Sequence, residues 1–227
     1  MALYIFKPQE TEVNRLLLEQ KKKSLSYYPV KGTLDHATKE QFQSDPKYAD
    51  FNVDGYRVYL GQGKQIFDRA CEGLKAWKQF EMGWVELFYP DTPLQEGSDV
   101  VILARVGTYN LSACRVVYVI EEDTPQSHRF GFAYGTLEMH VERGESRFII
   151  EWDKTTDRVI YDVLSYSNHN TWFTKVAAPV ARYIQQMFGA ESVKALQRWV
   201  NGTTQITWLY RSCESFVRNT TENWSSE

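Results

Sequence analysis

Residues 128–167 read HRFGFAYGTLEMHVERGESRFIIEWDKTTDRVIYDVLSYS, and this stretch decides the fold of the chain. It contains three runs rich in β-branched and aromatic residues, separated by short polar turns, which is typical of consecutive antiparallel strands. An amphipathic segment at about residues 171–199 follows immediately, with apolar side chains on one helical face. The stretch therefore predicts a sheet with one long C-terminal helix packed across it.

The residues before this stretch predict a further strand, a helix and three more strands. Residues 56–63 (YRVYLGQG) form a short strand that ends at two glycines, and residues 64–81 carry apolar side chains on one helical stripe. No helix separates the next strands, which are expected at 84–89, 100–106 and 112–122. The predicted fold class is α+β, with a curved antiparallel sheet of about seven strands wrapped around the C-terminal helix.

The chain divides into a central domain and two flanking segments. Residues 1–54 predict an N-terminal helix and then an irregular arm that lies over the central domain, anchored by Tyr27, Tyr28 and Phe42. The central domain spans residues 55–200. Residues 201–227 form a C-terminal extension whose aromatic residues suit a peripheral helix, a partly ordered extension, or a segment that binds a protein partner or a membrane surface.

Composition and charge exclude several functional classes. The formal net charge of -3 argues against nucleic-acid binding, because phosphate backbones require a concentrated basic surface. Cys71, Cys114 and Cys213 are far apart and lack CxxC spacing, which is typical of reduced thiols in an intracellular protein. No apolar run approaches the ~18 residues of a membrane helix, and the N-terminus lacks a signal-peptide pattern, so we expect a cytoplasmic protein.

The order of elements and several short strings resemble known families. A strand, a helix, six strands and a long helix over about residues 56–200 resemble the helix-grip fold of the START and polyketide-cyclase-like superfamily. Five strings are similar to the uncharacterised UPF 0548 family: LGQG (60–63), GW (83–84), CRVVY (114–118), GFAYGTL (131–137) and GESRF (144–148). That family has no established activity, so the resemblance implies a fold and no catalytic residues. Plant members have been described as chloroplast outer-envelope proteins, which implies a plastid or membrane-associated location as the alternative.

Alternation along the strands separates the two faces of the predicted sheet. One parity is charged and is expected to face water: Arg105, Arg115, Glu121, Glu145, Arg147, Glu151, Arg158 and Asp162. The other parity is apolar and should face the C-terminal helix. The strand at 128–137 allows two interpretations, with either the rings at 130, 132 and 134 or the glycines at 131 and 135 on the inner face. The cost of burying Arg129 favours the aromatic parity.

The apolar face predicts a small-molecule site between the sheet and the C-terminal helix. Aromatic rings with a few hydroxyl groups suit a hydrophobic ligand, such as a lipid, isoprenoid or pigment, that has one or two polar ends. The alternative is that the hydroxyls bond one another or the backbone and that side chains fill the space. The residues expected to bind the ligand are Tyr118, Phe130, Phe132, Tyr134, Thr136, Trp152, Tyr161 and Ser165.

No catalytic motif accompanies this site. The four histidines show no HxH or HxxxH spacing, no G-x-S-x-G elbow occurs, and we expect neither a metal nor a cofactor. The sequence therefore favours a carrier or store over an enzyme. One alternative is a cyclase, isomerase or hydrolase of the same fold, in which Tyr134 and a neighbouring residue act as proton donor and acceptor, an interpretation that a raised pKa on a buried acid beside Tyr134 would favour. The other is a membrane-associated or partner-binding protein.

Overall fold

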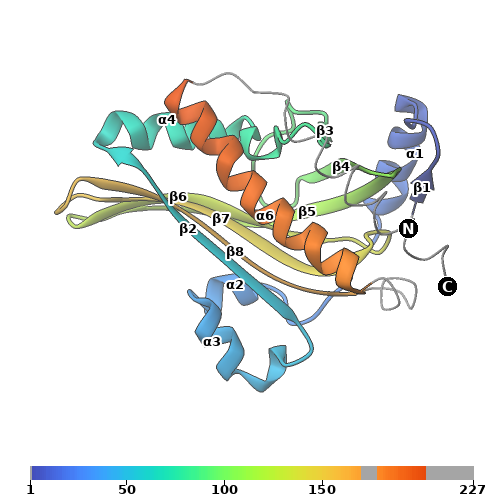
Figure 1. Ribbon diagram of the computed structural model, residues 1–227, viewed down its shortest axis with the longest axis horizontal. Helices are drawn as coiled ribbons and strands as arrows, with labels where there is room; N and C mark the ends of the chain where they lie inside the picture. The colour runs from blue at the N-terminus through green and yellow to red at the C-terminus, as the bar shows by residue number, and fades with distance from the viewer. Residues whose placement is uncertain (1, 170–177, 203–227) are drawn as a thin grey trace, which may run out of the picture.

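The computed structural model describes residues 2–169 and 178–202, and it contains a curved antiparallel sheet with helices on both faces (Figure 1). The strand order is β2-β8-β7-β6-β5-β4-β3, with β1 paired to β5. The strands are β1 (Ala2–Tyr4), β2 (Asn52–Gln62), β3 (Val85–Phe88), β4 (Asp99–Val106), β5 (Thr108–Asp123), β6 (Ser127–Thr136), β7 (Glu142–Asp153) and β8 (Arg158–His169). The helices are α1 (Glu10–Gln20), α2 (Gly32–Asp35), α3 (Lys39–Ser44), η1 (Pro46–Tyr48), α4 (Lys64–Lys75), η2 (Lys78–Phe80) and α6 (Ala178–Asn201). The predicted α+β fold, an antiparallel meander closed by a C-terminal helix, is confirmed.

Helices α4 and α6 cover one face of the sheet, here called the inner face because it carries the main core (Figure 1). Apolar side chains of α4, η2 and α6 pack there against inward-facing residues of β6, β7 and β8. Phe130, Phe132 and Tyr134 belong to this core, which confirms the aromatic parity of β6 as the inner one. Removing these large rings from water supplies much of the driving force for closing the helices onto the sheet.

The helix predicted over residues 64–81 is shorter in the structure. Helix α4 ends at Lys75, and Trp77 follows with a φ of 56°, in the left-handed region, which interrupts the helical hydrogen bonding. The turn η2 then carries Phe80 into the core. The apolar periodicity continues through this break, so the sequence pattern predicted a single helix.

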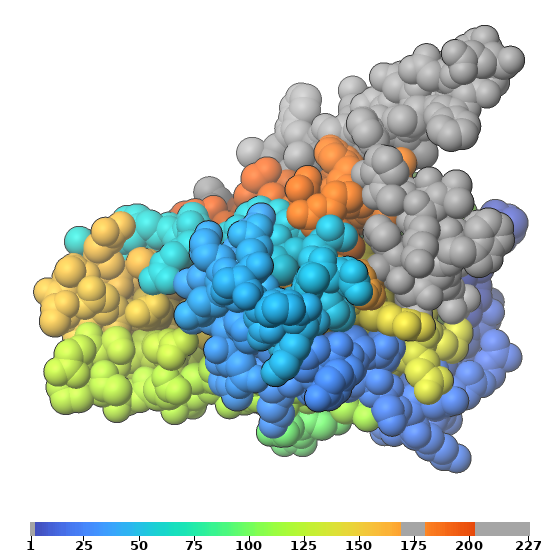
Figure 2. Space-filling model, turned by 90° about the horizontal axis from the view of Figure 1, so that it is seen from below, coloured from blue at the N-terminus to red at the C-terminus, as the bar shows by residue number. Residues whose placement is uncertain are grey.

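Residues 24–51, here called the arm, lie across the outer face of the sheet, opposite α6 (Figures 1 and 2). The arm is not irregular as predicted, because it contains α2, α3 and η1. Tyr27 and Phe42 are buried anchors, whereas Tyr28 is 84% exposed, so the prediction that Tyr28 anchors the arm is wrong. Gly135 makes room for Tyr27, since a Cβ at Gly135 would lie 2.2 Å from the Tyr27 hydroxyl oxygen. The face of β6 that carries Gly131 and Gly135 is therefore the outer face, and it accommodates the arm.

The arm also buries two charged residues that the alternation pattern assigned to solvent. Glu145 is 1% exposed and Arg147 is 5% exposed. The pattern placed both correctly on the face away from α6, but the expectation that they face water is wrong because the arm covers them. Periodicity within a strand identifies its faces and does not reveal what a distant segment packs against.

Parts of the predicted C-terminal elements lie outside the described residues. Helix α6 is described from Ala178 and ends at Asn201, close to the predicted end near residue 199. The predictions for 171–177 and for 203–227 fall on residues outside the described ranges. Among the helices that the structure does describe, none is both long and apolar enough to cross a membrane.

Candidate functional site

Side chains on the inner face form transverse rows, because residues paired across antiparallel strands point to the same side. Two neighbouring rows are apolar, and the residues that form them are Phe130, Ile150, Tyr161 and Val58 in one, and Phe132, Phe148, Val163 and Tyr56 in the next. The third row consists of Tyr134 on β6, Ser146 on β7, Ser165 on β8 and Asp54 on β2. We call this third set the polar row. The inner face thus changes abruptly from large apolar side chains to polar ones, with two small serines at the centre of the row.

The space above the apolar rows is filled by aromatic side chains from the covering elements. The Phe80 ring centroid lies 6.2 Å from that of Phe148, 6.0 Å from that of Tyr134 and 6.0 Å from that of Phe188 on α6. Trp77 packs edge-on against Phe132, with ring centroids 5.1 Å apart. Rings at these distances form a packed core and leave no room for a ligand between them.

The polar row is more open than its neighbours. Between residues 144 and 150 of β7, Ser146 is the one partly exposed residue, while the residues around it are buried. Ser165 is also partly exposed, although strands flank it on both sides. Both serines face α6 from the interior of the sheet, so their partial exposure means that the side chains above the polar row do not cover them completely.

The N-terminal half of α6 borders the polar row through polar contacts. Arg182 pairs with both carboxylate oxygens of Asp54, with an Nη2–Oδ1 distance of 2.6 Å, and also donates to Oε1 of Gln185 at 3.2 Å. The side-chain amide of Gln185 donates to the hydroxyl of Ser167 on β8 at 3.2 Å. These bonds fix α6 over β2 and β8 and leave the hydroxyls of the polar row beside it.

Glu142 and His140 lie at the same end of the sheet. Burial raises the pKa of Glu142 from its ordinary 4.5 to about 7, while hydrogen bonds from Gln185 and Ser167 partly offset this rise. Burial lowers the pKa of His140 to about 4, so its imidazole is neutral, and its Nδ1 accepts a hydrogen bond from the backbone N–H of Glu142. Tyr134 is buried, which raises the pKa of its hydroxyl well above 10, and the charge of Glu142 adds to this effect. The site therefore contains an acid that titrates near neutral pH.

The raised pKa of Glu142 predicts a specific dependence of stability on pH. Between about pH 4.5 and 7 the unfolded chain releases the Glu142 proton and the folded chain retains it, so the free energy of unfolding falls as the pH rises. The variant Glu142→Gln lacks this contribution. We expect the free energy of unfolding of the variant to rise relative to that of the wild type between about pH 4.5 and 7, and the difference to stay constant above pH 7. Urea denaturation at a series of pH values measures both free energies. If the free energies of unfolding of the two proteins changed with pH in parallel, the raised pKa of Glu142 would be contradicted.

The structure distributes the eight predicted ligand-binding residues among four environments. Phe130, Phe132, Tyr161 and Trp152 belong to the packed inner core or its edge. Tyr134 and Ser165 lie in the polar row. The hydroxyl of Thr136 is bonded to Ser26 at 2.7 Å and to the backbone N–H of Gly144 at 3.0 Å, so the arm and β7 already engage it.

Tyr118 was assigned to the inner face, and this assignment is wrong. A β-bulge between Val116 and Tyr118 inserts one residue into β5, so the alternation of side chains reverses beyond it. The Tyr118 side chain is buried on the outer face, where its hydroxyl bonds the Thr33 hydroxyl at 2.7 Å. Nothing in the continuous β-branched sequence of β5 indicates the bulge, so alternation along the strand predicted the wrong face for Tyr118.

Sequence reasoning missed Ser146, Glu142 and the Asp54–Arg182 pair. A signal existed for Ser146, which interrupts the apolar parity of β7 two residues before Phe148. Asp54 lay before the predicted start of the first strand, which begins instead at Asn52. Glu142 is the first residue of β7 and directly follows the turn after β6. Its place beside α6 depends on a long-range contact that no local pattern reveals.

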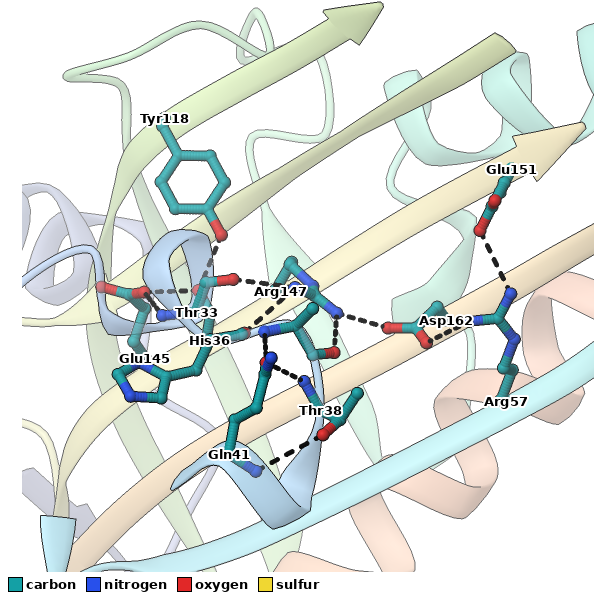
Figure 3. Close-up of polar contacts among 11 residues, drawn as sticks. Thr33, His36, Thr38, Gln41, Arg57, Tyr118, Glu145, Arg147, Glu151 and Asp162 are labelled. Carbon is teal, nitrogen blue, oxygen red and sulfur yellow. Dashed lines mark hydrogen bonds and ion pairs between the residues drawn. The ribbon is translucent and has the colours of Figure 1, made fainter. Parts of the chain in front are cut away.

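A second polar cluster lies on the outer face beneath the arm (Figure 3). Glu145 accepts hydrogen bonds from the Tyr27 hydroxyl at 2.7 Å, from the backbone N–H groups of Lys31 at 2.8 Å and Thr33 at 2.9 Å, and from the Thr33 hydroxyl. Arg147 donates to the backbone carbonyls of Thr33 at 2.8 Å and Ala37 at 3.1 Å. The chain itself supplies these partners, so this cluster anchors the arm, and the polar row is the better candidate for a ligand site.

The curved antiparallel sheet wrapped around a C-terminal helix defines an α+β protein of the helix-grip class. A family profile described as a domain of unknown function, DUF1990, matches residues 33–195. A UPF0548 protein of Dictyostelium discoideum is 36% identical over 208 residues, which cover 88% of this chain and 96% of that protein. A UPF0548 protein of Deinococcus radiodurans is 30% identical over 195 residues, which cover 81% and 87% of the two chains. The chain therefore belongs to the UPF0548 family, and the resemblance found in the sequence is confirmed.

Solved structures with a similar chain trace are distant in sequence. A hypothetical protein of Helicobacter pylori has a TM-score of 0.46 and 12% identity, covering 70% of this chain and 93% of that one. Norcoclaurine synthase of Thalictrum flavum has a TM-score of 0.43 and 10% identity, covering 69% and 90% of the two chains.

Proposed function

We propose that the protein binds a small, largely apolar molecule between the sheet and α6, with the polar end of the ligand at the polar row. The observation that carries this proposal is the partial exposure of Ser146 and Ser165 in the middle of an otherwise buried face. Small hydroxylated residues next to aromatic rings provide both the space and the orienting hydrogen bonds that ligand sites require.

The neighbouring rings support an apolar body for this ligand. Tyr134 and Phe148 have ring centroids 5.6 Å apart, and Phe188 of α6 belongs to the same core. A ligand whose polar end reaches Ser146 or Ser165 would place its remaining atoms against the edge of this cluster. Because Phe80 occupies the space above the apolar rows, the ligand is expected to be shorter than one that fills the whole interval between sheet and helix.

Placing an indole above the polar row tests the proposal. We expect Ser165→Trp to lower the binding of an uncharged apolar dye, Nile red, at least about tenfold, because the new side chain occupies the volume above the polar row. Fluorescence titration measures the affinity, and native mass spectrometry of the same preparations shows whether a co-purifying small molecule is lost. Circular dichroism establishes that the variant remains folded.

Gln126→Trp is the matched control, since it adds the same indole at an exposed position in the turn between β5 and β6. This control should bind the dye like the wild type. Equal dye binding by Ser165→Trp and the control, with both proteins folded, would place the dye elsewhere and would refute a site at the polar row.

A second candidate function, proton-transfer catalysis on the bound molecule, is favoured by the raised pKa of Glu142. A carboxyl group that titrates near pH 7 can act as a general acid or base under physiological conditions, and the Tyr134 hydroxyl lies in the same polar environment. The test is to incubate the protein with its co-purifying molecule and to follow that molecule's mass and chromatographic retention over time. Conversion that Glu142→Gln abolishes while binding persists would support catalysis, whereas an unchanged molecule with the wild type would exclude it for that ligand.

A further inference from the structure

We propose that the ligand's polar end is a hydrogen-bond donor, an alcohol or a protonated amine, and that the site rejects ligands ending in a carboxylate. This inference rests on the function proposed above and specifies the chemical class of its ligand. It follows from the charges and hydrogen-bonding groups that the described residues place around the polar row.

Arg182, the cation on α6 beside the polar row, already forms an ion pair within the protein. Both oxygens of the Asp54 carboxylate bind Arg182, and Gln185 accepts a further hydrogen bond from the same guanidinium. The pKa of Arg182 is raised, chiefly by its hydrogen bonds with Asp54, so the ion pair is stable in the folded state. A ligand carboxylate would have to displace Asp54 from this pair or remain unneutralised, and a buried unpaired charge is costly.

The remaining groups are mainly hydrogen-bond acceptors or groups that can accept. The Ser146 hydroxyl, which shares a hydrogen bond with the Tyr134 hydroxyl, and the Ser165 hydroxyl can each accept as well as donate, and Glu142 accepts whenever it is ionised. Asp54, Arg182, Ser167 and Gln185 surround Glu142 from β2, α6 and β8, and the neutral His140 lies two residues before it. In this environment an ammonium group gains a carboxylate partner, a hydroxyl gains an acceptor, and a carboxylate meets like charge.

Three probes that share one alkyl chain test this inference: decan-1-ol, decylamine and decanoic acid. Each is titrated calorimetrically into the full-length protein at pH 6 and pH 8, below its aggregation concentration. At pH 8 we expect the alcohol and the amine to bind and the acid to bind at least about tenfold more weakly than the alcohol. The amine should bind several-fold more tightly at pH 8 than at pH 6, because Glu142 ionises between these values, whereas the alcohol should change little.

The variant Glu142→Gln separates the effect of this carboxyl group from the contribution of the alkyl chain that the three probes share. We expect this variant to remove the pH dependence of decylamine binding and to reduce the difference in affinity between decanoic acid and decan-1-ol. Glu122→Gln, an exposed residue paired with Arg129 at the far end of the sheet, is the matched control and should behave like the wild type.

Two outcomes distinguish this inference from the function on which it rests. If decanoic acid binds as tightly as the alcohol or more tightly, the inference about the polar end is wrong while the ligand site stands. If no probe binds the wild type, and Nile red binding is also insensitive to Ser165→Trp, the proposed function itself fails.

Discussion

Replacing Glu145 by alanine is expected to lower the free energy of unfolding by about 3–5 kcal/mol and to detach the arm from the sheet. The carboxylate is 1% exposed and accepts four hydrogen bonds, all from Tyr27, Lys31 and Thr33 of the arm. Its removal would leave these donors buried without an acceptor, whereas Arg147 keeps its ion pair with Asp162, at an Nη2–Oδ1 distance of 2.7 Å. Urea denaturation measures the loss, and hydrogen exchange at the amides of Lys31 and Thr33 shows whether the arm has opened.

Glu122→Ala is the control, because Glu122 is an exposed residue in a single surface ion pair with Arg129. We expect this control to cost no more than about 1 kcal/mol. The interpretation of Glu145 as the anchor of the arm would be refuted if the two variants were equally stable and the amides of residues 31 and 33 stayed protected.

Truncating Phe80 is expected to have the second large effect, both on stability and on ligand size. Phe80 is 2% exposed and packs against Tyr134, Phe148 and Phe188, so Phe80→Ala should cost about 3–5 kcal/mol. The cavity that it leaves would adjoin the polar row at Tyr134. The variant should therefore bind dodecan-1-ol more tightly relative to decan-1-ol than the wild type does, as measured by calorimetry.

Phe80→Leu provides the graded comparison, since it keeps most of the apolar volume and should fall between the wild type and the alanine variant in both measurements. If Phe80→Ala lowered stability without changing the preference between the two alcohols, Phe80 would be a core residue that does not limit the depth of the ligand site.

The large features of the fold could be predicted from local pattern, and the site could be predicted only in part. The strands and the final helix follow from apolar periodicity, and the inner face of β6 follows from the cost of burying Arg129. Tyr134 and Ser165 were identified because they share a parity with apolar neighbours. Tyr118 was misplaced because a single inserted residue reverses that parity.

The errors that remain have a common physical origin in long-range packing. The burial of Glu145 and Arg147 depends on an arm that precedes them by about a hundred residues, as the bonds from Lys31 and Thr33 show. The place of Glu142 beside α6 likewise depends on Gln185. Such contacts depend on the register and path of segments far apart in the chain, and the periodicity of one strand contains no information about them.

Strand β7 carries Glu145 and Arg147 on its outer face and Ser146 on its inner face. The residues that anchor the arm and the serine of the proposed ligand site are therefore consecutive along one strand. Inserting or deleting a single residue within this strand would exchange the two sets, turning a carboxylate and a guanidinium toward α6 and a serine toward the arm. Changes in chain length in this part of the family are therefore expected to be confined to the turns at 137–141 and 154–157, which join β7 to its neighbours.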